Sequence, residues 1–307
     1  MSHRPCPRSL MTRRRAFALL LLIALCWGLN WPLGKMLLEH LPPLWVVLLR
    51  SALGTLALGG LCLARGRLVW PRRGDWPLIL AVGGLHMTAF SALVSVGLTQ
   101  VSAGRAVLLA YTTPLWVLPL AALTLHERPT WPQWLGASMA LLGLLVLFQP
   151  ADFDWADGRA WRGNGLLLLG AMCWSGSMVY IRAHRWVTPP FELTFWQALL
   201  ATLLLLPVVL AIEGPPRFVV SAQDLALLVY GGVFAIAVAY WALTTVNRAM
   251  PSGLTSLGLL FVPVVGIFSS QLLLGERPDA GLLIAGLCIL CGVLTSLWAA
   301  PRAQGVR

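Results

Sequence analysis

The sequence predicts an all-α integral membrane protein with ten transmembrane helices, built as two inverted five-helix repeats. Three observations predict this fold: a hydrophobic composition, a series of apolar runs of membrane-spanning length, and an internal duplication. Of the 307 residues, 58% are hydrophobic and only 11% are charged, whereas a soluble globular domain has about 25% charged residues. These few charged side chains cannot cover a water-exposed surface, so much of the surface must face lipid.

The apolar runs have the length of membrane spans. A helix needs about 20 apolar residues to cross a hydrocarbon core of about 30 Å. The segments that meet this length are 16–38, 43–64, 76–98, 104–125, 131–149, 163–182, 190–212, 225–246, 252–274 and 279–299. Several are separated only by short turns with Pro or Gly, which leave no room for an extramembrane domain.

The distribution of basic residues predicts the orientation, because cytoplasmic loops carry the excess of Lys and Arg. With the N-terminus inside, fifteen of the 22 basic residues fall on inside segments, six on outside segments, and Arg50 within a span. The sequence therefore predicts an inner-membrane protein with both termini in the cytoplasm.

Topology also explains the net charge of +11. The bases form no stripe with interleaved aromatic residues, so nucleic acid is not an expected partner.

The second half of the chain repeats the first at an offset of 147 to 149 residues. The matched positions are, in order, Cys26-Trp27 with Cys173-Trp174, Pro42-Pro43 with Pro189-Pro190, Gly83-Gly84 with Gly231-Gly232, Pro114 with Pro263, and Glu127-Arg128-Pro129 with Glu276-Arg277-Pro278. Each half holds five predicted spans, an odd number, so the halves enter the membrane in opposite senses. Inverted repeats of this kind are typical of secondary transporters, whose substrate site lies near the midplane between the repeats.

The duplication divides the chain into two repeats with short flanking segments. The predicted divisions are a cytoplasmic N-terminal segment 1–15, a first repeat 16–150, a periplasmic linker 151–162, a second repeat 163–299 and a cytoplasmic tail 300–307.

A set of short motifs resembles a known family over essentially the whole chain. The motifs are Leu22-x3-Cys26-Trp27-Gly28-x-Asn30, Arg50, Pro114-Leu115-Trp116, and Glu127-Arg128-Pro129 leading into Gly136 and Gly143. Together they resemble the EamA family of the drug/metabolite transporter superfamily. The resemblance implies an exporter of amino acids, other metabolites or drugs. The second copy departs from the pattern, since Ser175-Gly176-Ser177 replaces Gly28-Leu29-Asn30 and Gln197 replaces Arg50.

Corresponding segments in the two halves carry small polar or helix-interrupting residues. The first span contains Asn30 and Pro32 between two glycines, and its repeat partner contains Ser175 and Ser177. Such residues are tolerated in lipid mainly where they face protein or a cavity, and paired interruptions indicate a transport site. Close helix packing through small residues is the alternative interpretation.

Pro114 and Pro263 are predicted near the midplane, since Pro114 lies ten residues beyond Gly104 and Pro263 ten beyond Gly253, or about 15 Å. Each frees a carbonyl one turn earlier, around Ala110 and Leu259. Hydroxyl groups stand near these points: Tyr111, Thr112 and Thr113 in the first half, Thr255 and Ser256 in the second. The prolines are interpreted as hinges, and the hydroxyls as candidate substrate contacts.

Several aromatic residues are predicted deeper than the interfacial belt in which Trp and Tyr usually lie. They are Trp27, Trp116, Trp174, Tyr240 and Trp241. An aromatic-lined cavity of this kind would suit apolar or aromatic solutes.

His86 is predicted near mid-depth, ten residues into the third span. It is interpreted either as a buried neutral imidazole bonded to a carbonyl or as a proton-coupling group, because imidazole titrates near physiological pH. A proton is thus one candidate coupling ion. No Asp or Glu falls at the centre of a span, so no carboxylate is placed to carry a proton across the membrane.

Arg50 is predicted about 10 Å below the outer surface, seven residues beyond Pro43. A charged residue in a span usually faces the protein interior or a water-filled cavity. One interpretation is a structural bond to helix-end carbonyls, for which its repeat partner Gln197 could substitute. The other is attraction of a substrate carboxylate near the outer gate.

The sequence therefore predicts a secondary transporter that exports small organic solutes by alternating access. Amino acids or related metabolites are the expected class, with drug or amphiphile efflux as the alternative. An intramembrane enzyme or a non-transporting scaffold is the rival of another class. The six cysteines are interpreted as small apolar fillers, and neither a metal nor a cofactor is expected.

The predicted substrate-binding residues are Trp27, Asn30, Arg50, His86, Tyr111, Thr112, Trp174, Ser175, Ser177, Tyr240, Trp241 and Ser256, and the predicted hinges are Pro32, Pro114 and Pro263.

Overall fold

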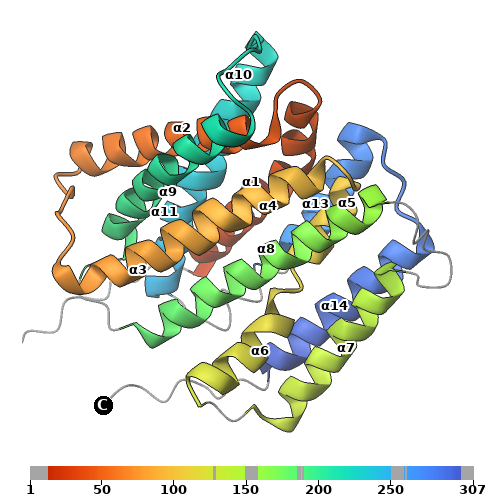
Figure 1. Ribbon diagram of the computed structural model, residues 1–307. Coiled ribbons are helices and arrows are strands. Elements are labelled where there is room, and N and C mark those ends of the chain that lie inside the picture. The colour runs from red at the N-terminus through yellow and green to blue at the C-terminus, as the bar shows by residue number, and fades with distance from the viewer. Residues whose placement is uncertain are drawn as a thin grey trace, which may run out of the picture.

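The computed structural model describes residues 13–126, 129–148, 158–184, 188, 190–249, 259 and 261–298. These residues form helices joined by short turns, with no β-strand among them (Figure 1). The α-helices are α1 (Arg13–Leu38), α2 (Pro43–Ala64), α3 (Trp76–Leu80), α4 (Ser91–Leu98), α5 (Ala103–Ala110), α6 (Thr113–Thr124), α7 (Trp131–Phe148), α8 (Gly158–Ala183), α9 (Pro190–Ile212), α10 (Ala222–Val229), α11 (Ala239–Ala249), α13 (Phe261–Leu274) and α14 (Ala280–Trp298). A 3₁₀ turn, η1 (Arg73–Asp75), precedes α3. Two π-helical segments, η2 (Ala81–Phe90) and η3 (Tyr230–Val238), join α3 to α4 and α10 to α11.

Each predicted span overlaps one of these helices or one continuous helical run. In the part of the chain that the structure describes, seven helical runs are long and apolar enough to cross a membrane. Three apolar helices are shorter: Trp131–Val146, Phe261–Leu274 and Ala280–Thr295. The protein is therefore a multi-pass, all-helical membrane protein, and the count of ten spans stays a prediction.

The helix α8 begins at Gly158, five residues before the predicted span 163–182. Its first turns carry the exposed residues Arg159 and Arg162. Backbone hydrogen bonding does not depend on an apolar side chain, so the helix extends beyond the apolar run that the prediction followed. Residues 151–157 of the predicted linker lie outside the described residues.

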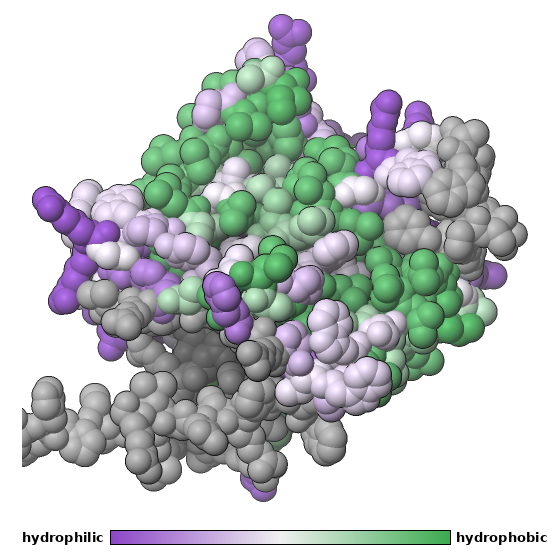
Figure 2. Space-filling model, turned by 60° about the horizontal axis from the view of Figure 1, so that its bottom comes forward, coloured by the Kyte–Doolittle hydropathy of each residue, from purple (hydrophilic) through white to green (hydrophobic). Residues whose placement is uncertain are grey.

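The surface of the helices is largely apolar, as a lipid-facing surface must be. Leu56 is 72% exposed and Leu123 is 76% exposed. Figure 2 shows broad apolar areas on one face, with most hydrophilic side chains projecting from its margins. Exposed leucines at this density would be unfavourable in water and are favourable against acyl chains.

The contacts between helices repeat when the two halves are exchanged. The first helix of the first half, α1, packs on α13 and α11, and its counterpart α8 packs on α6 and α4. Likewise α2 packs on η3 and α9 packs on η2. The equivalent helices α7 and α14 lie side by side (Figure 1). The internal repeat of the sequence is therefore also a repeat of packing.

The two π-helical segments occupy equivalent positions in the two halves, and each contains one of the matched Gly-Gly pairs. A Cβ at Gly232 would lie 2.8 Å from the carbonyl oxygen of Arg50, and a Cβ at Gly83 would lie 3.0 Å from that of Gln197. Only glycine permits this close backbone approach. Each π segment thereby brings the third helical run of one half against the second helix of the other.

The helix in front of Pro114 is interrupted, as the proline predicts. Tyr111 and Thr112 form a turn between α5 and α6. The carbonyl of Ala110 accepts a hydrogen bond from the Thr113 hydroxyl at 2.7 Å, which satisfies the oxygen that the proline leaves without a donor.

Polar links join the halves at the helix ends. The carboxylate of Glu276, before α14, accepts hydrogen bonds from the backbone of Ala103 and Gly104 and lies 3.3 Å from the Lys35 ammonium. The carboxylate of Glu213, after α9, accepts from the first backbone groups of α2, those of Leu44 and Trp45. A carboxylate at a helix N-terminus satisfies free N–H groups and favours the helix dipole.

Candidate functional site

A cavity of about 180 Å³ lies between the two halves. Its wall comes from α1, α2, the η2–α4 run, the end of α5, α8, α9 and the η3–α11 run. The lining residues are Trp27, Asn30, Trp31, Gly34, Leu38, Val46, Val47, Arg50, Ser51, His86, Met87, Phe90, Ser91, Val94, Ser95, Leu98, Tyr111, Trp174, Ala198, Ala235, Ile236 and Tyr240.

The cavity extends toward one end of the molecule only. Along α1 its wall runs from Trp27 to Leu38, or about 16 Å, and along η2–α4 it runs from His86 to Leu98. By contrast α8 contributes only Trp174, near the middle of that helix. The cavity therefore begins in the middle of the bundle and follows the C-terminal parts of α1 and α4.

The deep end of the cavity is an aromatic cluster. The His86 ring stacks on Trp174, with centroids 5.2 Å apart and planes 11° apart. Trp174 also meets Phe90 and Tyr111 at centroid distances of 5.2 and 5.7 Å. Tyr240 lies edge-on to Trp27 at 5.7 Å, and its hydroxyl lies 3.5 Å from His86 Nδ1. These six side chains form the aromatic end of the cavity: Trp27, His86, Phe90, Tyr111, Trp174 and Tyr240.

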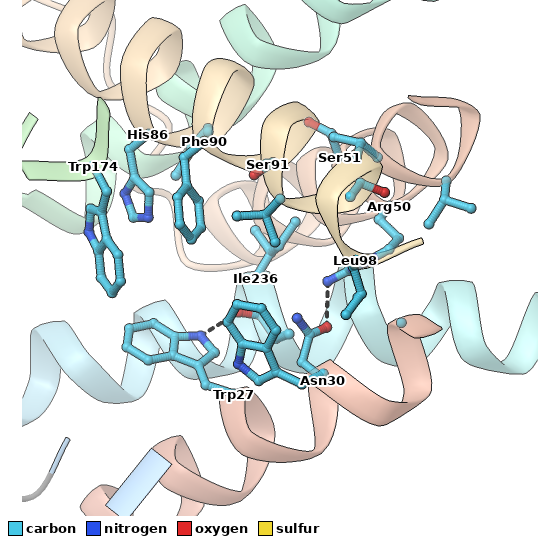
Figure 3. A pocket seen from close by; sticks show the side chains of 18 of the residues that line it. Trp27, Asn30, Arg50, Ser51, His86, Phe90, Ser91, Leu98, Trp174 and Ile236 are labelled. Carbon is cyan, nitrogen blue, oxygen red and sulfur yellow. Dashed lines mark hydrogen bonds between the residues drawn. The ribbon is translucent and has the colours of Figure 1, made fainter. Parts of the chain in front are cut away.

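Trp27 is held in this cluster by the π-helical segment of the other half. Its indole Nε1 donates a hydrogen bond of 2.9 Å to the carbonyl of Ala235 in η3 (Figure 3). The bond fixes the orientation of the ring in the cavity wall.

The other end of the cavity contains its charged group. The Arg50 guanidinium donates a hydrogen bond to the side-chain oxygen of Asn30 (Figure 3). Ser51 lies near Arg50 in Figure 3, and Ser91 and Ser95 also line the cavity. The cavity wall among the described residues contains no Asp or Glu.

Seven of the twelve predicted substrate-binding residues line the cavity: Trp27, Asn30, Arg50, His86, Tyr111, Trp174 and Tyr240. Ser256 lies outside the described residues. Thr112, Ser175, Ser177 and Trp241 do not line the cavity.

The hydroxyls that miss the cavity bond to backbone. Ser175 donates to the carbonyls of Ala171 and Thr113, and so ties α8 to the break before α6. Ser177 donates to Trp174 O, and Thr112 to Leu109 O. Trp241 packs with neighbouring apolar residues, and the Arg65 guanidinium lies 5.8 Å above its ring.

The three predicted hinge prolines occupy different settings. Pro32 lies inside the continuous helix α1, Pro114 follows the break between α5 and α6, and Pro263 is buried within α13. A change of shape at these positions stays a prediction.

Sequence reasoning missed several lining residues, above all Trp31, Met87 and Phe90. The signal was present in helical periodicity. Residues 86, 90, 94 and 98 recur every four positions on the face that carries His86, and 87, 91 and 95 lie beside them.

In the described part of the chain no three His, Cys, Asp or Glu side chains group as a metal site would require. Cys288 and Cys291 have a C-x-x-C spacing on α14, and both are free thiols, as are Cys26, Cys62 and Cys173.

Comparisons with known proteins agree with this geometry. A model of the EamA-like transporter family matches residues 14–149 and again residues 161–298, once in each half. A probable amino-acid metabolite efflux pump of Escherichia coli (strain K12) is 28% identical, over 96% of this chain and 98% of its own length. A probable terminal-alkyne amino-acid exporter of Streptantibioticus cattleyicolor is 29% identical, over 73% of this chain and 74% of its own length. Proteins named as transporters fit a non-enzymatic role.

A solved crystal structure shares the fold, with a TM-score of 0.65 and 22% identity over 95% of this chain and 100% of the solved chain. The family model covers both halves, and the helical repeat, the apolar surface and the cavity between the halves fit its architecture. The chain belongs to the EamA-like transporter family.

Proposed function

We propose that this transporter exports small organic solutes, foremost amino acids and related metabolites, by alternating access through the cavity between its halves. The observation that carries the proposal is the shape of that cavity. Both halves enclose its deep aromatic end, and it extends toward one end of the molecule only. A site in the middle of the bundle that is reached from one side at a time is what alternating access requires.

We propose the topology that accompanies this function: ten spans in two inverted repeats, 16–150 and 163–299, joined by the periplasmic segment 151–162. The segments 1–15 and 300–307 lie in the cytoplasm in this topology, and the protein resides in the inner membrane. In this topology the C-terminal end of α1, at Leu38, is its outer end, so the cavity extends toward the outside. This is the side to which an exporter releases its solute.

Two relatives support amino acids as the solute class, since their names specify an amino-acid metabolite and a terminal-alkyne amino acid. Efflux of amphiphilic drugs is a second candidate, favoured by the aromatic end of the cavity. The two candidates differ in the solute that moves.

The test is efflux from preloaded cells. Cells with a measured amount of the protein in the membrane are loaded with labelled amino acids or with a fluorescent amphiphile, and efflux is compared with empty-vector cells. We expect faster efflux of one or more amino acids, and loss of that gain in Asn30→Leu, which places an apolar side chain beside Arg50. Equal efflux from both cell types for every solute would contradict the proposal.

A further inference from the structure

Arg50 is a cation without a counter-ion in the cavity wall. Among the described residues it hydrogen-bonds only to the neutral side chain of Asn30, and its Nε has no hydrogen-bond partner. Lys35, on the neighbouring helix, differs, since its ammonium lies 3.3 Å from the Glu276 carboxylate. A guanidinium removed from water without a carboxylate destabilises a protein. The structure therefore holds an uncompensated positive charge where a solute can reach it.

A glycine of the second half leaves space for the Arg50 side chain. The Arg50 side chain lies against Gly231 of η3, where a Cβ would come within 2.8 Å of Arg50 Cδ and 2.9 Å of Cζ. A larger residue at position 231 would displace the guanidinium. The side-chain oxygen of Asn30, on α1, accepts a hydrogen bond from the guanidinium. Two halves of the chain thus position the cation by shape and by a neutral hydrogen bond.

The cavity has two chemically different ends. Figure 3 shows Arg50 and Asn30 on one side of the cavity, Trp174 and His86 on the opposite side, and Phe90 and Ser91 between them. The described cavity lining contains no acidic side chain, so it offers no carboxylate to pair with an ammonium group.

We propose that the cavity recognises the carboxylate of its solute at Arg50 and the apolar or aromatic body at the aromatic end, and has no site for an amino group. The substrate class is amphipathic carboxylic acids: amino acids bind through the carboxylate alone, and derivatives whose amino group has been removed or acylated bind at least as well. A planar guanidinium suits a carboxylate because it can donate two parallel hydrogen bonds. The inference rests on the proposed function in one respect: it takes this cavity as the solute site.

Three probes with the same phenyl ring separate the charges. They are 3-phenylpropionate, which carries only a carboxylate, phenylalanine, which carries both charges, and phenethylamine, which carries only an ammonium. Binding is measured by calorimetry on the purified full chain in detergent. We expect 3-phenylpropionate to bind about tenfold to a hundredfold more tightly than phenethylamine, the ratio that a hydrogen bond to a charged group provides, and phenylalanine to bind no more tightly than 3-phenylpropionate.

A near-isosteric variant sharpens the test. Asn30→Asp places a carboxylate beside Arg50, so it should lower the affinity for 3-phenylpropionate at least tenfold while phenethylamine binds as well as before or better. The matched control is Arg65→Gln, which removes a positive charge from the end of the same helix α2 but outside the cavity lining. It should leave the affinities for all three probes unchanged.

Three results would overturn the proposal: phenethylamine binding as tightly as 3-phenylpropionate, Asn30→Asp retaining the affinity for the acid, or none of the probes binding at millimolar concentration. The first would indicate that the aromatic rings hold an ammonium by cation–π attraction instead. Selective binding of the acid without any efflux would contradict the proposed function and leave this inference intact.

Discussion

His40 and Asp224 join the two halves, since the imidazole Nδ1 lies 2.9 Å from a carboxylate oxygen of Asp224. The aspartate is buried and also accepts hydrogen bonds from the backbone and hydroxyl of Ser221. Asp75 stands at the equivalent position of the first half and accepts a 2.6 Å hydrogen bond from Thr188 of the second. The aspartate in the first turn of the third helical run of each half therefore bonds across to the other half.

Asp224→Asn should destabilise the protein by about 2 kcal/mol, because it weakens both a helix cap and a charge-assisted link. The measurement is the midpoint of thermal unfolding in detergent. Glu39→Gln is the control, since Glu39 is exposed beside His40 and a surface change has an effect within about 0.5 kcal/mol. An unchanged midpoint for Asp224→Asn would show that the link contributes nothing.

Gly232→Ala should destabilise the protein by about 1–3 kcal/mol, the usual effect of overpacking. Its Cβ would lie 2.7 Å from Leu53 Cβ and 2.8 Å from a backbone oxygen that cannot rotate away. Gly84→Ala is the matched control in the other π segment, where a Cβ would meet nothing within 4 Å. This variant should be neutral or stabilised by up to about 1 kcal/mol. Similar unfolding midpoints for both variants would contradict the packing argument.

Arg50→Gln should raise the stability of the protein while it lowers export of acids. Gln still offers a donor to Asn30, and the substitution removes the uncompensated charge. We expect a gain of about 1 kcal/mol, because an uncompensated charge removed from water destabilises the folded protein. Thermal unfolding and efflux of a labelled acid are measured on the same preparation. Loss of stability with retained efflux would mean that Arg50 has a structural role.

His86→Phe should retain efflux and its pH dependence, because the phenyl ring can keep the stacking on Trp174. The profile is measured between about pH 5 and 8, where an imidazole changes charge. His86→Ala, which removes the ring, is expected to lower efflux at every pH. A profile that becomes flat in His86→Phe would instead assign proton coupling to His86.

Reporter fusions test the proposed topology. A fusion after Gly158 should report the periplasm and a fusion after Ala303 the cytoplasm, as the distribution of basic residues predicts. A cytoplasmic signal after Gly158 would mean an even number of spans in the first half. The halves would then not be inverted.

The sequence predicted where the apolar helices lie, because the bilayer sets the length of an apolar segment. The spans 43–64 and 190–212 coincide with α2 and α9. It could not predict which of two equivalent positions in the repeat lines the cavity. Asn30 lines it, whereas its repeat partner Ser177 bonds to its own helix. The sequence repeat makes the two positions equivalent, but the cavity extends toward one end of the molecule and therefore reaches only one of them.

The links between the halves were also beyond sequence reasoning. The spacing Ser221-x-x-Asp224 is a typical helix start, yet nothing local indicates that Asp224 meets His40, 184 residues earlier. Such a contact depends on how two helices cross, which the apolar pattern of each helix does not specify.

The π-helical segments Ala81–Phe90 and Tyr230–Val238 bear on the ancestry of the chain. π-helical turns are rare, and each requires a local departure from regular helix geometry. A single origin of the π segment, before the gene duplicated, explains its presence at the same place in both halves more simply than two independent origins. On that account the ancestral half already carried its π segment and its glycine pair. Two copies of such a half, placed in opposite senses, could have formed the crossing of η3 on α2 as an antiparallel dimer, before both were encoded in one chain.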